Sequence, residues 1–178
     1  MTRYVALLRG IGPGDPRMRN ENLRAVCEEL GSEQVATVIS SGNIVFDSTS
    51  VDGAELETRL QAAWSAKLGF QSLTIVRSRS DPEGLVASKP FGALEHGPRS
   101  YLLVTFSKHP LTVEFDLPHR PADAAYEMVA ATPRELCTVT DTTSERTPDV
   151  MAWIERRFGQ QVSSRTWLTV ARILRKMA

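Results

Sequence analysis

Apolar residues along the first third of the chain follow strand-like and helix-like spacing in turn. Residues Tyr4 to Leu8 form a continuous apolar run that ends at a Gly/Pro cluster, which indicates a buried strand. Apolar residues then recur at helical spacing from Leu23 to Leu30, and Gly31 follows where a left-handed residue would end a helix. The pattern predicts a central strand, a loop and a first amphipathic helix.

Residues 34–77 complete a recognisable order of elements. Two β-branched runs, 34–40 and 43–47, are separated by Ser41-Gly42, the residue types of a tight hairpin turn. Residues 52–69 read as a helix with an aspartate N-cap and a glycine end, and 72–77 as a fourth strand. The resulting β-α-β-β-α-β order predicts a ferredoxin-like first half, residues 1–80.

The remainder of the chain repeats this plan in a degraded form. Residues 81–97 combine a short helix with Gly- and Pro-rich loop and are expected to link two halves. An irregular stretch from 108 to 124 stands where the second half, 98–178, should have its first helix. The expected strands are 100–106, 127–131, 134–140 and a short one near 161–162, with a helix at 148–158. We therefore expect an α+β fold of two ferredoxin-like halves, the second degenerate, followed by a C-terminal helix.

The C-terminal segment predicts an amphipathic helix with basic residues on its outer faces. We interpret Ser163 and Ser164 as its caps. Basic residues in the last turn suit the negative end of the helix dipole, so their charge does not require a ligand. The face expected to pack consists of Trp167, Val170, Ala171 and Leu174.

Composition indicates an ordinary globular protein without a global charge. The 178 residues are 42% hydrophobic, and 21 basic residues balance 21 acidic ones, so nucleic-acid or anionic-membrane binding would have to come from local patches. Cys27 and Cys137 match neither a disulfide framework nor a zinc site. The apolar run at 4–8 is too short for a signal peptide or a membrane span, and we expect a cytoplasmic protein.

The most suggestive segment for chemistry is the Gly-rich loop from Arg9 to Arg19, between a buried strand and a helix. Glycines allow close backbone approach to an anion, the helix start presents N–H groups, and three arginines add charge. It is no Walker A loop, because no Lys-Ser/Thr follows the glycines, and Asp15 replaces the third glycine of a dinucleotide fingerprint. The alternative is a tight loop with solvated arginines.

Other motifs have a structural explanation beside the functional one. Ser41 and Asn43 suit a hairpin turn, and Trp167 suits a core anchor as well as a stacking platform. The three histidines lack metal-site spacing, so we expect no metal and no cofactor, and no hydrolase motif is present. The aromatic strand of RNA-recognition modules is missing as well.

Three motifs taken together resemble a single protein family. They are Tyr4-Val5-Ala6-Leu7-Leu8-Arg9-Gly10-Ile11, Ser41-Gly42-Asn43-Ile44-Val45-Phe46 and Arg165-x-Trp167-x-Thr169-Val170. Leu30-Gly31 and a phenylalanine after Lys89-Pro90 accompany them. The chain thereby resembles, over nearly its whole length, the bacterial family called domain of unknown function 1697. The resemblance implies a small cytoplasmic α+β protein of unassigned activity.

The chain departs from the family pattern at several polar positions. The family usually has asparagine at Gly12, a further glycine at Asp15 and glutamine at Ser40. It also tends to have asparagines where Thr166 and Leu168 flank the tryptophan. If these polar groups bind a ligand in relatives, this protein differs in specificity or lacks the site.

We therefore hypothesise a binding module for a phosphate-bearing small molecule or nucleic acid. Two alternatives stay open: a protein-interaction or self-associating module, and an enzyme with a site between the halves that no motif reveals. The sequence does not determine the oligomeric state. The expected ligand-binding residues are Arg9, Gly10, Gly12, Gly14, Arg17, Arg19, Ser41, Asn43, Arg165 and Trp167.

Overall fold

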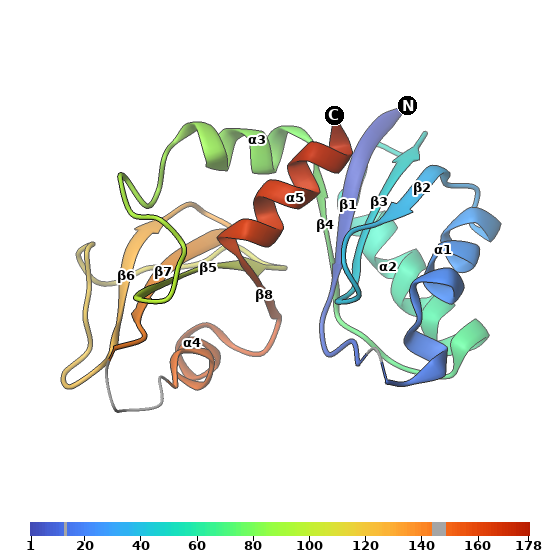
Figure 1. Ribbon diagram of the computed structural model, residues 1–178. Helices are drawn as coiled ribbons and strands as arrows, with labels where there is room; N and C mark the ends of the chain where they lie inside the picture. The colour runs from blue at the N-terminus through green and yellow to red at the C-terminus, as the bar shows by residue number, and fades with distance from the viewer. Residues whose placement is uncertain (13, 144–148) are drawn as a thin grey trace. The chain divides into compact units, whose positions relative to one another are not determined.

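The computed structural model describes residues 1–12, 14–143 and 149–178 and contains, in these residues, two four-stranded antiparallel sheets and five α-helices (Figure 1). By internal packing the chain divides into two units. Unit 1 comprises Met1–Gly84 and Ala171–Ala178, and unit 2 comprises Leu85–Val170. The domain ranges 1–80 and 98–178 with a linker at 81–97 stay predictions, because compactness does not show that a part folds alone.

The sheet of unit 1 has the strand order β2-β3-β1-β4 with every neighbour antiparallel. β1 is central, as its continuous apolar run predicted, and Val5 in its middle pairs with Val45 and Arg77. The predicted antiparallel pairing of the second and third strands is confirmed. The strands are β1 Thr2–Leu8, β2 Glu33–Thr37, β3 Asn43–Ser48 and β4 Thr74–Ser78.

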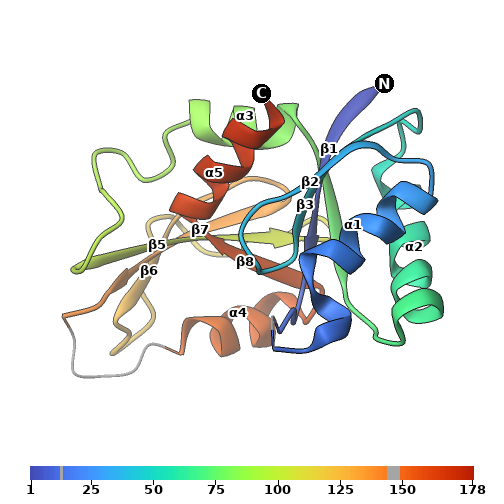
Figure 2. The same cartoon turned by 45° about the vertical axis from the view of Figure 1, so that its right-hand side comes forward.

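Two helices cover one face of this sheet, α1 Asn20–Glu29 and α2 Gly53–Ala63 (Figures 1 and 2). The Asp52 carboxylate caps α2 by accepting from the N–H groups of the first turn, at 2.8 and 3.3 Å. A π-helical turn, Trp64–Leu68, continues α2 and ends at Gly69 with a φ of +69°. A short 3₁₀ turn, Pro16–Met18, precedes α1.

The main core of unit 1 lies between these helices and the sheet. Its largest fully buried side chain is Trp64, whose indole N–H donates to Thr74 Oγ1 at 3.0 Å and whose ring stacks on Phe70. The helix-facing residues of β1 are those at even positions, from Tyr4 to Leu8. The alternate residues of the sheet, among them Val5 and Arg77, are also buried, so both faces are covered.

The sheet of unit 2 repeats the first arrangement, with the order β6-β7-β5-β8. Its strands are β5 Ser100–Ser107, β6 Tyr126–Ala131, β7 Glu135–Asp141 and β8 Val162–Thr166. Helix α4, Val150–Phe158, covers one face, and Pro148, at which we expected it to begin, lies outside the described residues. Helices α3 Ser80–Ala87 and α5 Trp167–Met177 follow β4 and β8, and each has residues in both units.

Aromatic packing holds the irregular stretch that replaces a helix between β5 and β6. The Phe115 ring lies 4.3 Å from that of His119 and 5.9 Å from that of Trp153, between ring centroids. Phe158 at the end of α4 joins the same cluster. Apolar burial thus docks this segment without helical structure.

Three local expectations were wrong. The hairpin turn is wider than Ser41-Gly42, because five residues, 38–42, lie between β2 and β3. The first of them, Val38, donates its N–H to Asn43 O. Ser163 and Ser164 lie inside β8 instead of capping α5, since the alternating strand continues to Thr166.

The buried face of α5 also differs from the expected one. Ala171 is exposed, while Val170, Ile173 and Met177 are buried and Leu174 is half-buried. The helix begins at Trp167, directly after β8 ends at Thr166. The direction of β8 therefore determines which side chains of the helix are buried.

Candidate functional site

Three loops gather at the end of β1. They are the Gly-rich loop, described at 9–12 and 14–19, and the connections 38–42 and 69–73, and we call them the loop cluster. The Arg9 N–H donates to Leu73 O at 2.8 Å, and Ser72 Oγ donates to Arg9 O at 2.7 Å. On the other side, Asn20 Nδ2 donates to Ile39 O at 3.3 Å. The Gly-rich loop is therefore held by direct hydrogen bonds to 69–73 and, through Asn20 at its end, to 38–42.

At Gly42 the hairpin connection packs very closely against the end of β1 and the residues that follow it. Its φ is +74°, and a Cβ on it would lie 2.6 Å from Ile11 Cγ1 and 2.9 Å from Leu8 Cβ. Its carbonyl accepts from the Leu8 N–H at 2.8 Å. Both the backbone conformation and the surrounding space therefore require glycine here.

Ser41 and Asn43 stabilise the same connection. Asn43 is almost completely buried, and its Nδ2 donates to Val38 O at 2.9 Å and to Ser41 Oγ at 3.0 Å. These bonds satisfy a buried carbonyl that the wide turn leaves outside the sheet ladder. The two residues thus shape the loop cluster from inside.

Arg17 forms an ion pair within the Gly-rich loop. Its Nη2 lies 2.7 Å from Asp15 Oδ2, and its Nη1 donates to Gly69 O at 2.9 Å. The hydrogen bonds from Arg17 lower the pKa of Asp15, and the carboxylate in turn raises the pKa of Arg17. Asp15 therefore offsets part of the positive charge that the sequence placed here.

Arg19 occupies the N-cap position of α1 and is exposed. Its side chain makes no hydrogen bond with a described residue, and it provides no side-chain cap. The backbone N–H groups of Asn20 and Glu21 likewise donate to no described residue. The start of α1 thus presents backbone donors beside the exposed Arg19 guanidinium, and the acidic Glu21 lies in the same first turn.

The glycines of the loop differ in what they contribute. Gly10 has a φ of +73° and makes the turn out of β1. Gly12 and Gly14 have no such requirement, and the Gly12 N–H donates to the sulfur of Met18 at 3.3 Å. Only Gly10 among these three needs the conformational freedom of glycine.

Arg165 and Trp167 lie in unit 2, whereas the other eight predicted ligand-binding residues lie in unit 1. Arg165 is buried in β8, where its Nη1 donates to Ser163 Oγ at 2.9 Å and to Ser164 O at 2.8 Å. Burial lowers the pKa of this guanidinium to about 10. Its contacts give the arginine a structural role, which the sequence did not reveal.

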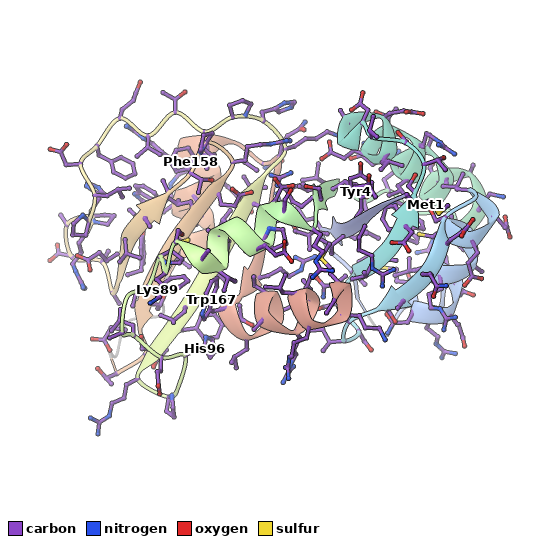
Figure 3. The ribbon with its side chains drawn as sticks, turned by 90° about the horizontal axis from the view of Figure 1, so that it is seen from above. Met1, Tyr4, Lys89, His96, Phe158 and Trp167 are labelled. Carbon is purple, nitrogen blue, oxygen red and sulfur yellow. The ribbon has the colours of Figure 1, made fainter. Side chains whose placement is uncertain are left out.

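Trp167 packs as an anchor at the start of α5. Its ring contacts that of Phe91 edge to face, with 5.1 Å between centroids. Figure 3 labels Trp167 among the side chains of this segment. Thr166 precedes it and caps the helix, because its Oγ1 accepts from the Thr169 N–H at 3.2 Å.

The sequence reasoning missed a second buried arginine, Arg77 in β4. Arg77 pairs with Val5 of the central strand, as Arg165 pairs with Val104 of β5. Arg77 Nη1 donates to the carbonyl of the preceding residue, Val76, at 3.0 Å, as Arg165 does in its own strand. At both sites an arginine of the strand is followed by a hydroxyl residue, Ser78 or Thr166, shortly before a helix. This repeat was visible in the sequence.

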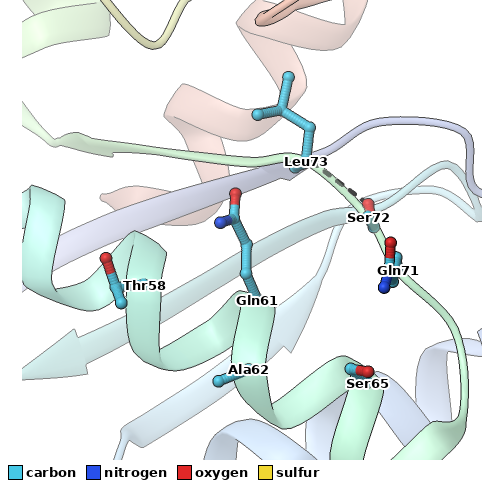
Figure 4. A pocket seen from close by; sticks show the side chains of 7 residues that line it. All are labelled: Thr58, Gln61, Ala62, Ser65, Gln71, Ser72 and Leu73. Carbon is cyan, nitrogen blue, oxygen red and sulfur yellow. Dashed lines mark hydrogen bonds between the residues drawn. The ribbon is translucent and has the colours of Figure 1, made fainter.

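A polar groove in unit 1 was also missed. Its volume is about 460 Å³, and α2, the π-helical turn and the segment entering β4 form its walls (Figure 4). No sequence motif marks it, because its residues are ordinary helix and loop residues spaced over 16 positions. The lining residues are Thr58, Gln61, Ala62, Ser65, Gln71, Ser72 and Leu73.

Metal and membrane sites are not apparent in the described ranges. Within residues 1–12, 14–143 and 149–178, no three His, Cys, Asp or Glu side chains are grouped so as to hold a metal ion. Within the same ranges, every helix is too short or too polar to cross a bilayer. Burial raises the pKa of Cys27 and Cys137 to about 12, so both thiols stay protonated.

Comparison with known proteins identifies relatives of this chain. It resembles the structure of a conserved bacterial protein, SP0830, from Streptococcus pneumoniae, with a TM-score of 0.75 and 22% identity over 99% of this chain and 98% of that chain. At that identity the similarity shows the fold alone. No curated protein matches. A family model described as protein of unknown function, DUF1697, matches residues 1–136, and the chain therefore belongs to the DUF1697 family.

Proposed function

We propose that the loop cluster binds a phosphate-bearing small molecule. One observation carries the proposal: the exposed Arg19 guanidinium stands at the start of α1, where the backbone N–H groups of Asn20 and Glu21 have no acceptor among the described residues. Helix starts favour anions because their N–H groups and dipole present positive charge. An arginine beside them adds charge-assisted hydrogen bonds.

The backbone around the proposed site is fixed by close packing and hydrogen bonds. Gly42 and Asn43 fix the hairpin connection, and hydrogen bonds to Arg9 fix the beginning of the Gly-rich loop. The backbone beside the start of α1 is therefore fixed before a ligand arrives, which reduces the ordering cost of binding, whereas the exposed Arg19 side chain would be ordered by the ligand. Arg17 is already paired with Asp15, so an incoming phosphate would compete with that carboxylate.

Charge distribution favours a small molecule over nucleic acid. Basic and acidic residues balance at 21 each, and the loop cluster is a local patch instead of an extended basic stripe. A protein that follows a nucleic-acid backbone neutralises several phosphates along a groove. A single anion needs only the donors gathered at one helix start.

The proposal is tested by calorimetric titration of the protein with ADP and with inorganic phosphate. Arg19→Ala removes one charge without breaking a hydrogen bond to a described residue, and we expect it to weaken ADP binding by ~10-fold or more, the worth of one charged hydrogen bond. Arg172→Ala, at an exposed position of α5, removes the same charge elsewhere and should leave affinity unchanged. Equal effects of both variants, or no binding by the wild type, would overturn the assignment.

Oligonucleotide binding is the alternative outcome of the same experiment. A single-stranded oligonucleotide that binds more tightly than ADP, with an affinity that falls steeply as salt rises, would indicate nucleic acid as the ligand. We expect weak or absent binding, because no aromatic side chain belongs to the described loop cluster except the buried Phe70.

We also infer that each unit is built on a ferredoxin-like plan. The β-α-β-β-α-β order of unit 1, with β1 and β3 central and both helices on one face, supports this classification. Unit 2 has the corresponding strand order without the first helix. The classification concerns fold and does not by itself favour any function.

A further inference from the structure

We propose that the polar groove along α2 and the π-helical turn is a binding site for a neutral, hydroxyl-rich small molecule, a hexose or disaccharide. The site is separate from the proposed anion site and goes beyond it. Its volume of about 460 Å³ falls in the range of small-molecule pockets, which is about 300–1,000 Å³. Figure 4 shows polar side chains from both walls around it.

The side chains that line the groove determine the class of ligand. Among the described lining residues, none is charged or aromatic. The lining has two carboxamides and three hydroxyls, groups that can pair with the hydroxyls of a sugar. The Thr58 and Ser72 hydroxyls donate to carbonyls of the chain, so they face a ligand as acceptors. A phosphate would find no cation there and a nucleobase no stacking partner. The polar lining residues are Thr58, Gln61, Ser65, Gln71 and Ser72.

The groove is held in shape by hydrogen bonds behind its surface. Gln61 Oε1 accepts from the Thr74 N–H at 3.0 Å, which fixes the carboxamide of the central lining residue. Ser72 is held by its bond to Arg9 O. On the buried side, the Trp64 indole N–H donates to Thr74 Oγ1 and so fixes the helical turn to β4. Side chains fixed in this way lose little conformational entropy when a ligand binds.

The π-helical turn is a second, independent feature of this site. A π turn is rare and appears mostly as a single insertion in an α-helix, frequently at functional sites. Here it spans Trp64–Leu68 and carries the lining residue Ser65, with Gly69 ending it in the left-handed conformation. The wider turn places Ser65 on the groove wall opposite Gln71 and Ser72 (Figure 4).

Two alanines of α2 and the π turn provide a matched test. Ala62 is exposed and lines the groove, whereas Ala66, four residues later, is also exposed but is not among the described lining residues. Titration with glucose, galactose and maltose, followed by ¹⁵N–¹H NMR, should give saturable shifts at groove amides for at least one sugar. Ala62→Phe should weaken that binding by at least ~10-fold, and Ala66→Phe should leave it unchanged.

Several results would overturn the proposal. They are the absence of a saturable shift with all three sugars at millimolar concentration, shifts confined to residues outside the groove, and equal binding by Ala62→Phe and wild type. Should Ala62→Phe fail to fold, the location of the wild-type shifts decides alone. The Arg19→Ala experiment with ADP is independent of all these outcomes.

Discussion

Individual residues of the loop cluster either build it or stand exposed on it. Gly42 and Ser41, with the adjacent Asn43 of β3, fix the backbone of the hairpin connection, whereas Arg19 is exposed and makes no hydrogen bond with a described residue. The glycines that indicated an anion-binding loop therefore do not all have the same structural role. Gly10 is needed for its turn, while Gly12 leaves room for a side chain.

Three glycine substitutions separate these causes. Gly42→Ala meets both a left-handed backbone and a contact of 2.6 Å, so we expect a loss of about 2–4 kcal/mol in unfolding free energy. Gly10→Ala meets only the left-handed backbone and should lose about 1–2 kcal/mol. Gly12→Ala is the matched control and should change stability by less than ~0.5 kcal/mol. Urea unfolding measures all three, and a neutral Gly42→Ala would contradict this packing.

The two cysteines allow a prediction on reactivity and pH. Because burial raises their pKa to about 12, a disulfide reagent at pH 8 should label neither thiol in native protein and both after unfolding in urea. A folded pKa above the unfolded value stabilises the fold at low pH. That contribution is complete below the ordinary value of 9.0 and is lost as pH rises toward about 12. Rapid labelling of native protein would show that the thiols are accessible.

At the scale of elements, the edge strand β4 is closed by side chains. Its outward N–H groups at Thr74, Val76 and Ser78 donate to Gln61, Glu57 and Asp81, at 3.0, 3.0 and 2.8 Å. An unprotected edge strand is a template for pairing with another chain. Two side chains of α2 and one of α3 therefore prevent sheet extension along β4.

Glu57 is the buried member of this series and gives the clearest test. Glu57→Ala leaves the buried Val76 N–H without that acceptor and should cost about 1–3 kcal/mol of unfolding free energy. Glu57→Gln keeps an acceptor and should lose less. The control is Glu28→Ala, which breaks an exposed ion pair worth less than ~1 kcal/mol. Hydrogen exchange at Val76 should accelerate in Glu57→Ala alone, and equal exchange in all variants would contradict the role of Glu57.

The success of sequence reasoning also varies by element. The helix after Asp52 was predictable because its cap, apolar spacing and terminal glycine all agree. β8 was underestimated because its residues Ser163 to Thr166 are polar, and hydroxyl residues before a helix look like caps. The groove could not be predicted, since its lining residues come from α2, the π turn and the segment before β4, whose packing no sequence motif indicates. The Gly-rich loop could be nominated from the sequence as a candidate site, but the ion pair of Arg17 with Asp15 could not be predicted.

At the scale of the whole molecule, the two units have the same order of strands in their sheets and a buried arginine at the same position of the corresponding strand. Arg77 and Arg165 hold the same register against the central strand and donate to the same type of carbonyl. The sequence indicated the repeated order of elements, whereas pairing register was needed to show this equivalence. The strands β4 and β8, which precede α3 and α5, are therefore built in the same way.

This equivalence predicts similar penalties for removing either arginine. Arg77→Ala and Arg165→Ala each remove the donor to a carbonyl of the strand, and each should lower the unfolding free energy by about 1–3 kcal/mol. Arg172→Ala, at an exposed site, is the control. Denaturant unfolding of the three variants measures the effect. If one buried arginine proved dispensable, the two positions would not be equivalent.

The most direct test of the proposed function is a ¹⁵N–¹H NMR titration of the wild-type protein with ADP. We expect saturable shifts concentrated at Arg19, Asn20 and Glu21, and we expect these shifts to diminish in Arg19→Ala. Shifts that are absent, that never saturate, or that cluster away from the start of α1 would contradict it.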